Sequence, residues 1–388
     1  MDPFCGTGTT LVECKKNGIK SIGVEPNPMA YFASRVKVNW DINPELLLKH
    51  TGKIAGFAEK VLKSQGLEGP GDSPLFGRSR GNDVSLTELS AEGQKLILKN
   101  SISPIPLHKS LTLLETIEKF NNRPLTGHER LALAKAVVFG ASNLNFGPEV
   151  GVGTVRTDAP VVKLWLNNVR EMAQDLTQLH QLRKIEAKVY FADARALGKV
   201  LAPRSIDAVI TSPPYPNEKD YTRTTRLESV VLGLIKSKEE LRAVKRSLIR
   251  SNTRGVYKDD RDDQFIAGHQ EINRIAEMIE RRRIELGKTS GFERLYGKVT
   301  KLYFGGMARH LSDLRDFLRP GAYLAYVVGD QASYLRVLIQ TGRLIADLAE
   351  NLGYQVVKID PFRTRLATAT RKQLREEVVV LRYPGSKK

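Results

Sequence analysis

A glycine-rich turn that leads into a helix is the feature that most restricts the fold of this chain. Residues 2–10 read DPFCGTGTT, and Gly6 and Gly8 allow the backbone to approach a ligand closely. Residues 10–16 continue as an amphipathic helix whose free N–H groups favour a carboxylate. A short apolar run, SIGV at residues 21–24, follows and ends at Glu25. This order of loop, helix, strand and acid is typical of half of a doubly wound α/β unit.

The residues around this turn predict a ligand site, whereas the alternative is a plain connection. A ligand of the methionine type fits, with its carboxylate at the helix N-terminus and its ammonium group on Asp2. Glu25, at a strand tip, is placed to accept hydrogen bonds from both hydroxyls of a ribose, unless it is a solvated loop acid. Asp193 ends a later strand and would accept the protons of an adenine amino group; the alternative is a helix cap.

The segment TSPPY at residues 211–215 is the most specific signal in the sequence. It ends a predicted strand, and two consecutive prolines cannot extend a sheet, so the chain must leave in a rigid, extended form. Ser212 Oγ and the Pro213 carbonyl are then acceptors for the two hydrogens of an exocyclic amino group, and Tyr215 offers an aromatic face to an extruded base. The alternative is a buried Pro-Pro turn with a core tyrosine.

The secondary-structure pattern divides the chain into a core with two insertions. Strand patterns in the middle of the chain and alternating helices and strands near its end predict an open, mostly parallel sheet with an antiparallel last strand. We expect the first part of the core at residues 1–42, a helical insertion at 43–182, core strands with the TSPPY motif at 183–216, a basic insertion at 217–307 and the last part of the core at 308–388.

The charge balance points to a polyanionic partner. The chain has 61 lysines and arginines against 43 acids, a formal net charge of +18, which attracts nucleic acid. Charge alone does not decide this, because a run of charges is often only a solvated face. In the basic insertion, the residues predicted to contact nucleic-acid phosphates are Arg246, Arg250, Arg254, Arg281, Arg282 and Arg283.

The two cysteines indicate a reducing compartment. Cys5 and Cys14 form no CxxC or Cys/His pattern, so no metal site is predicted. The start of the chain has no signal-peptide pattern, and no apolar run approaches the roughly 20 residues needed to span a bilayer. We therefore expect a cytoplasmic protein without a membrane partner.

DPFCGTGTT, GVE at residues 23–25 and TSPPY together resemble the motifs of the amino-group DNA methyltransferases. The resemblance implies a Rossmann-like, seven-stranded α/β methyltransferase fold with helical insertions, S-adenosyl-L-methionine as cofactor, and DNA rather than RNA as substrate. In that family the serine form of the catalytic motif is associated mostly with N4-cytosine, and the aspartate or asparagine form mostly with N6-adenine. The expected product is N4-methylcytosine, with a cognate restriction endonuclease as a candidate partner.

The same resemblance implies a role for individual residues. Methyl transfer would run in line from sulfonium to nitrogen, without a covalent intermediate. C5-cytosine chemistry is disfavoured, because it needs a Pro-Cys nucleophile that neither cysteine provides. Cofactor contacts are implied for Asp2, Phe4, Gly6, Gly8, Thr9, Thr10, Glu25, Asp193 and Thr211, and contacts to the flipped base for Ser212, Pro213, Pro214 and Tyr215.

One departure from the family pattern concerns the start of the chain. An apolar strand normally precedes the first motif, whereas Met1 stands directly before Asp2. We therefore expect a truncated start or a first strand supplied by another segment, with unpaired neighbouring strands, low stability and weak cofactor binding.

Three alternatives remain beside N4-cytosine methylation. The first is an N6-adenine DNA methyltransferase. The second is an RNA guanine-N2 methyltransferase, which would usually carry aspartate where this chain has Ser212. The third belongs to another class: an inactive, truncated nucleic-acid binder kept for its basic surface.

Overall fold

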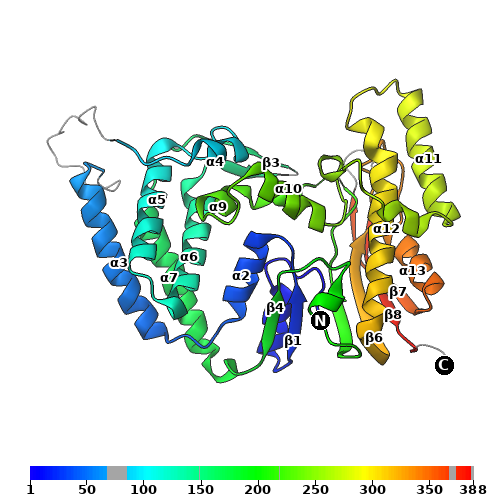
Figure 1. The fold of residues 1–388 in the computed structure, drawn as a ribbon, viewed down its shortest axis with the longest axis horizontal. Coiled ribbons are helices and arrows are strands. Elements are labelled where there is room, and N and C mark those ends of the chain that lie inside the picture. Colours follow the sequence, from blue (N-terminus) through cyan, green and yellow to red (C-terminus); the bar gives the residue numbers. More distant parts are fainter. Residues whose placement is uncertain (68–84, 148, 218, 367–372, 386–388) are drawn as a thin grey trace.

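The computed structural model describes residues 1–67, 85–147, 149–217, 219–366 and 373–385. Figure 1 shows a lobe of helices on one side, a sheet flanked by α12 and α13 on the other, and β1 and β4 between them. The helices are α1 (Thr9–Lys16), α2 (Pro28–Val38), α3 (Pro44–Ser64), α4 (Ala91–Leu96), α5 (Pro104–Lys119), α6 (Arg123–Lys135), α7 (Val161–Gln178), α8 (Tyr221–Thr224), α9 (Arg226–Val231), α10 (Lys238–Ser247), α11 (Gln270–Glu285), α12 (Tyr296–Leu314) and α13 (Thr341–Asn351). A π-helical turn, η1 (Ala136–Ala141), continues α6.

The strands form parallel and antiparallel ladders. They are β1 (Ser21–Val24), β2 (Leu144–Phe146), β3 (Val150–Val152), β4 (Ala187–Tyr190), β5 (Ile206–Thr211), β6 (Leu318–Gly329), β7 (Gln355–Leu366) and β8 (Gln373–Arg382). β1 pairs with β4 in parallel, β2 and β3 form a small antiparallel pair, and the remaining strands follow the order β5-β6-β8-β7. β5 and β6 are parallel, whereas β8 is antiparallel to both of its neighbours, so the predicted antiparallel last strand is confirmed.

The backbone of residues 1–5 lies between β1 and β5 and bonds to both. Asp2 N–H donates to the Ile22 carbonyl at 2.8 Å, and Val24 N–H donates to the Asp2 carbonyl at 3.0 Å. On the other side, Ile210 N–H donates to the Met1 carbonyl at 3.0 Å. The expectation that both neighbouring strands face an unpaired edge is therefore wrong along this stretch, because the residues before the glycines pair with them.

The glycine-rich turn has the geometry that its sequence predicts. Gly8 has a φ of 86°, in the left-handed region, and a Cβ there would lie 2.9 Å from Ser34 Cβ in α2. Position 8 needs glycine because of this positive φ and because of the close approach to Ser34. α1 begins at the next residue, Thr9. α2 begins after Asn27, whose Oδ1 accepts from Met29 N–H at 3.0 Å, with Pro28 in the first turn. The two helix starts thereby lie beside the turn.

Two large hydrophobic cores hold the molecule together. In one, α12 and α13 cover β5, β6 and β8, with Tyr303 and Tyr326 fully buried. In the other, α2, α3, α5, α6 and α7 surround Trp165, and α9 joins them through Leu227 and Val231. Burial of these apolar side chains supplies the main stabilisation of each part.

The face of the large sheet that points away from α12 is open to solvent. Ile210 is 52% exposed and Tyr323 is 51% exposed, and strand register places both on the side of Ala325 and Val380. We call these four residues the open face. Parallel strands are usually covered on both sides, so an apolar surface on a parallel pair is unusual. Among the described helices, none is long and apolar enough to cross a membrane.

Candidate active site

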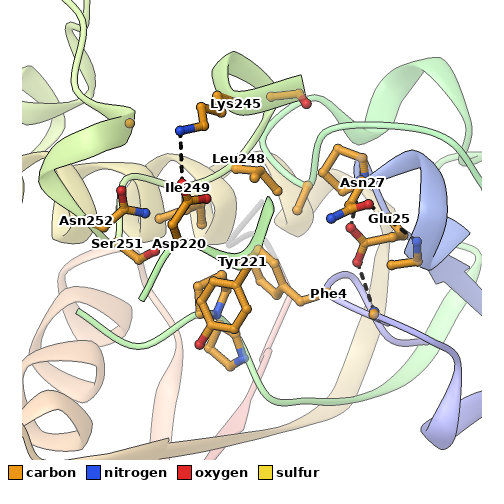
Figure 2. Close-up of a pocket in the computed structure, with 18 of the residues that line it drawn as sticks. Phe4, Glu25, Asn27, Asp220, Tyr221, Lys245, Leu248, Ile249, Ser251 and Asn252 are labelled. Atoms are coloured by element: carbon orange, nitrogen blue, oxygen red, sulfur yellow. Dashed lines mark hydrogen bonds and ion pairs between the residues drawn. The ribbon is translucent and has the colours of Figure 1, made fainter. Parts of the chain in front are cut away.

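A cavity of about 360 Å³ lies where β1, β4 and β5 end. The carboxyl ends of parallel strands are where doubly wound sheets bind ligands. Because this cavity is lined by residues predicted to be catalytic, we call it the catalytic cavity. Figure 2 shows Glu25 and Asn27 at one end of it, Phe4 and Tyr221 near its middle, and Ser251 and Asn252 at the other end. The residues predicted from sequence to bind cofactor or base that line it are Phe4, Gly6, Glu25, Asp193, Ser212, Pro213, Pro214 and Tyr215, and Arg250, predicted to bind phosphate, lines it as well.

Glu25 is a buried carboxylate with a defined orientation. Its Oε2 accepts from Gly6 N–H at 2.9 Å, and its Oε1 accepts from Asn27 N–H at 2.8 Å. Burial raises the pKa of Glu25 to about 7, although these two backbone bonds act against that rise. Each oxygen keeps one acceptor position after its backbone bond. The side chain can therefore accept two further hydrogen bonds from a ligand.

Asp193 is held by a neighbouring arginine. Its carboxylate pairs with the Arg195 guanidinium at 2.7 Å and also accepts from Arg195 N–H at 2.9 Å. The Arg195 side chain is buried and continues to Asp262 at 2.5 Å and to the Arg246 carbonyl at 2.9 Å. This network orients Asp193 in the cavity wall, and a ligand amino group would share its oxygens with Arg195.

Phe4 is supported from behind by His310. The two rings meet edge to face with centroids 4.8 Å apart. His310 lies fully buried between the Ala194 carbonyl and the Tyr326 hydroxyl, with both nitrogens at 2.8 Å from these groups. Burial lowers the pKa of His310 to about 4, so the ring is neutral at physiological pH. The turn before Gly6 is thus anchored to the main core.

The TSPPY motif leaves β5 at Thr211 and turns into the cavity wall. Tyr215 lies beside the end of β6, where a Cβ added to Gly329 would be 3.4 Å from its ring. Burial raises the pKa of Tyr215, and a hydrogen bond from the Ser212 side chain acts in the opposite direction. Tyr221 Oη accepts from Tyr215 N–H at 3.5 Å. The tyrosine is partly buried and lines the cavity.

Five of the residues predicted to bind the cofactor do not line the cavity. Asp2 and Thr211 satisfy each other in the interior, since Thr211 Oγ1 donates to Asp2 Oδ1 at 2.6 Å. Burial raises the pKa of Asp2, which is only 4% exposed. Gly8 ends the turn as the N-cap of α1, and Thr9 and Thr10 begin that helix. The wall of the cavity is formed instead by Phe4, Gly6 and the unpredicted Thr7.

The segment that follows TSPPY adds a buried ion pair that the sequence did not indicate. Lys245 Nζ lies 3.0 Å from Asp220 Oδ2, and both side chains are largely buried in the cavity wall (Figure 2). Burial favours a raised pKa for Asp220, yet Lys245 and Thr222 together hold it below its ordinary value. The basic pattern around Lys245 was visible in the sequence, but its partner was not.

Asn252 is a further unpredicted residue of the wall. Its Nδ2 donates to the Lys219 carbonyl at 3.3 Å, whereas its Oδ1 is buried and without a partner among the described residues. The Tyr334 hydroxyl donates to the Ser251 carbonyl at 3.0 Å and so fixes the position of Ser251, the residue before Asn252. No local pattern marks this segment, because it is assembled by contacts with distant parts of the chain.

The predicted phosphate-binding arginines differ in their availability. Arg250 is 5% exposed and pairs with Asp260 at 2.7 Å. Because this guanidinium is paired inside the protein, the structure does not support the predicted phosphate contact of Arg250. Arg246 pairs with Asp259, and Arg254 lies 3.6 Å from Glu149. On α11, Arg281 is exposed, whereas Arg282 and Arg283 pair along the helix with Glu285 at 3.1 Å and Glu280 at 2.6 Å. No residue of α11 lines the catalytic cavity.

The described part of the chain contains no group of three or more His, Cys, Asp or Glu side chains that could hold a metal ion. Cys5 is buried and Cys14 is partly buried, both as free thiols. Burial raises the pKa of Cys5 well above its ordinary value, so the thiol stays protonated. Neither cysteine lines the cavity.

No protein-family profile matches the chain, and no solved structure matches it. Among curated proteins, it is 25% identical over 406 residues to the Type II methyltransferase M.BsoBI of Geobacillus stearothermophilus, covering 98% of this chain and 78% of that protein. It is 23% identical over 411 residues to the Type II methyltransferase M.AvaI of Nostoc sp. strain PCC 7120, covering 99% and 80%. A shorter stretch of 64 residues is 38% identical to the Type II methyltransferase M.MjaII of Methanocaldococcus jannaschii, 16% of this chain and 12% of that protein. Along almost its whole length, this chain is therefore similar to Type II methyltransferases.

Proposed function

We propose that this chain is an S-adenosylmethionine-dependent DNA methyltransferase that transfers a methyl group to N4 of an extruded cytosine. The observation that carries the proposal is that Glu25, Asp193 and residues 212–215 line one cavity, although they lie far apart in the sequence. The similarity to Type II methyltransferases along nearly the whole chain supports the same reaction class.

The residues of the cavity fit the cofactor. Glu25 has two acceptor positions left for the ribose hydroxyls, and the backbone N–H of Gly6 fixes its direction. Phe4 contributes an apolar wall, and Asp193 an acceptor for the adenine amino group. When bound, the cofactor supplies an electrophilic methyl group.

The base is held by residues of the TSPPY motif. A base inside a duplex is inaccessible, so it must be extruded before its amino group can enter the cavity. The Pro213 carbonyl and Ser212 Oγ accept the two amino hydrogens, which directs the nitrogen lone pair toward the methyl donor. Tyr215 stacks on the base. The amino nitrogen is itself the nucleophile and releases one of its two protons to solvent once the new bond has formed, so no residue needs to bond covalently to the base.

The order of the strands supports the Rossmann-like methyltransferase fold that the motif resemblance implies. The sequence β4, β1, residues 1–5, β5, β6, β8 and β7 places seven segments side by side, linked by backbone hydrogen bonds. We assign it to the Rossmann-like methyltransferase fold, in which residues 1–5 take the place of the central strand. The regions at 43–182 and 217–307 are then insertions into that core.

Serine at position 212 favours N4-cytosine over N6-adenine and over guanine-N2 in RNA. In the family that the motifs resemble, this serine form is associated mostly with N4-cytosine, whereas the aspartate form is associated mostly with N6-adenine. The net charge of +18 is consistent with a nucleic-acid substrate. We further propose that the enzyme protects DNA from a cognate restriction endonuclease, the pairing to which Type II methyltransferases belong.

Expression in a host that lacks DNA methylation, followed by nucleoside mass spectrometry of the plasmid, tests the proposal. N4-methylcytosine is the expected product, and sequencing of the methylated plasmid maps the recognition site. N6-methyladenine instead would overturn the base assignment, and methylated tRNA with unmodified plasmid would overturn DNA as substrate. Glu25→Ala lacks the carboxylate proposed to hold the ribose of the cofactor and serves as the negative control.

A further inference from the structure

A second cavity, of about 650 Å³, adjoins the catalytic cavity. It lies between α2, α6, η1, α7 and α9, which pack against one another in the helical lobe (Figure 1). Thr7, Thr224 and Thr225 line both cavities, so the two adjoin at these small side chains. The proposed methylation does not use this space.

The second cavity contains a buried carboxyl group with an oxygen that has no partner among the described residues. Glu228 of α9 is 7% exposed; its Oε2 is buried without a hydrogen-bond partner, and its carboxylate accepts only from its own backbone N–H among these residues. Burial raises its pKa to about 7. His128, also in this wall, is 4% exposed with an unpartnered Nδ1. Buried polar groups are normally paired, so these side chains mark a ligand site.

The remaining wall suits a flat aromatic ring. It is mostly apolar, with Trp40, Leu131 and Met172 among its residues. Phe139 and Phe146 line it as well, are 68% and 44% exposed, and lie with ring centroids 5.9 Å apart. Aromatic side chains at the surface are platforms on which nucleic-acid bases stack.

We propose, on the basis of the proposed function, that the second cavity receives the guanine left unpaired when its partner cytosine is extruded. Guanine presents two adjacent donors, N1–H and the N2 amino group, which match the two oxygens of one ionised carboxylate, that of Glu228. Cytosine and adenine each present a donor beside an acceptor, and thymine one donor between two acceptors, so none of them pairs as well with this group. Lys37, in the same wall, is a candidate for the adjoining phosphate.

Replacement of that guanine by inosine, which lacks the N2 amino group, tests the assignment. DNA binding is measured with S-adenosylhomocysteine present, on duplexes carrying the mapped site, for the wild type and for Glu228→Gln. We expect the ratio of dissociation constants, inosine duplex over guanine duplex, to be about tenfold larger for the wild type. The weaker inosine–cytosine pair affects both proteins alike and cancels in this comparison.

Glu171→Gln is the matched control, because Glu171 lies in the same wall but already pairs with Lys135 at 2.6 Å. It should keep the inosine penalty of the wild type. An equal penalty in the wild type and in Glu228→Gln overturns the guanine site, while cytosine methylation and cofactor binding would still support the proposed function. If the mapped base is adenine, both proposals fall.

Discussion

At the scale of single residues, the protonation of Glu25 governs ligand binding. The pKa of this buried carboxyl is raised from 4.5 to about 7, so the folded protein keeps its proton to higher pH than the unfolded chain. Its contribution to the free energy of unfolding is therefore fully present below pH 4.5 and is lost as the pH rises through about 7. Ribose hydroxyls donate to the ionised form of Glu25, so the affinity for the ligand should rise with pH.

The first prediction concerns this pH dependence. The affinity for S-adenosylhomocysteine should increase as the pH rises from about 6 to about 8, and binding near pH 7 should release a proton. Calorimetric titration in two buffers of different ionisation enthalpy measures both. Glu25→Gln should bind more weakly and lose the pH dependence. Equal affinity of the wild type at both ends of this range would contradict the role given to Glu25.

Tyr215 should affect the base and not the cofactor. Loss of stacking costs roughly 1–3 kcal/mol, so Tyr215→Ala should lower kcat/KM by about tenfold to a hundredfold. The affinity for S-adenosylhomocysteine, measured by titration, should stay close to that of the wild type. Tyr215→Phe keeps the aromatic face and should retain most activity. A parallel loss of cofactor affinity in Tyr215→Ala would show that the ring supports the fold instead.

At the scale of elements, α11 is the helix that carries three of the arginines predicted to contact DNA phosphates. It lies outside α12 at one edge of the molecule, away from the catalytic cavity (Figure 1). Charge reversal at Arg281, Arg282 and Arg283 should reduce the slope of log affinity against log salt by about one for each phosphate that the helix no longer neutralises. Filter binding of duplex DNA at several salt concentrations measures the slope.

Lys184 provides the control for α11. It precedes β4 at the end of the strand opposite the cavity, and its side chain is 72% exposed beside Asp41. Lys184→Glu should leave the salt slope unchanged. If reversal of the three arginines leaves the slope unchanged as well, α11 is a solvated face.

At the scale of the whole molecule, the open face of the sheet is the main apolar surface left uncovered beside β5 and β6. Its side chains Ile210 and Tyr323 are about half exposed, so their burial is incomplete in the isolated chain. We expect Ile210→Thr with Tyr323→Thr to reduce concentration-dependent light scattering and to change the melting temperature little. Leu324→Thr, on the buried side of β6, should lower the melting temperature strongly.

A partner segment on the open face would change this outcome. If another segment or a second copy covers this face, the double threonine variant should melt at a clearly lower temperature than the wild type. Melting curves with and without S-adenosylhomocysteine also test the expectation of low stability and weak cofactor binding. A cooperative transition that shifts upward with ligand would contradict that expectation.

The sequence by itself determined the local pieces that the site is made from. β1 was predicted at residues 21–24, where it is observed, because a short apolar run between a glycine turn and an acid has few other conformations. Pro213 and Pro214 lack the N–H groups that a strand needs, so the end of β5 at Thr211 also follows from the sequence. Gly8 likewise has the positive φ expected for such a turn.

Only the tertiary structure decided which of these groups face a ligand. Asp2 and Thr211 are 209 residues apart and hydrogen-bond each other in the interior, and Arg250 is paired with Asp260 inside the protein. The Asp220–Lys245 pair and the unpartnered Glu228 likewise depend on how the insertions pack. A local pattern sets backbone conformation, because φ and ψ preferences act between neighbours. Burial and pairing depend on residues brought together from distant parts of the chain, and these decide whether a charged side chain binds a ligand or stabilises the fold.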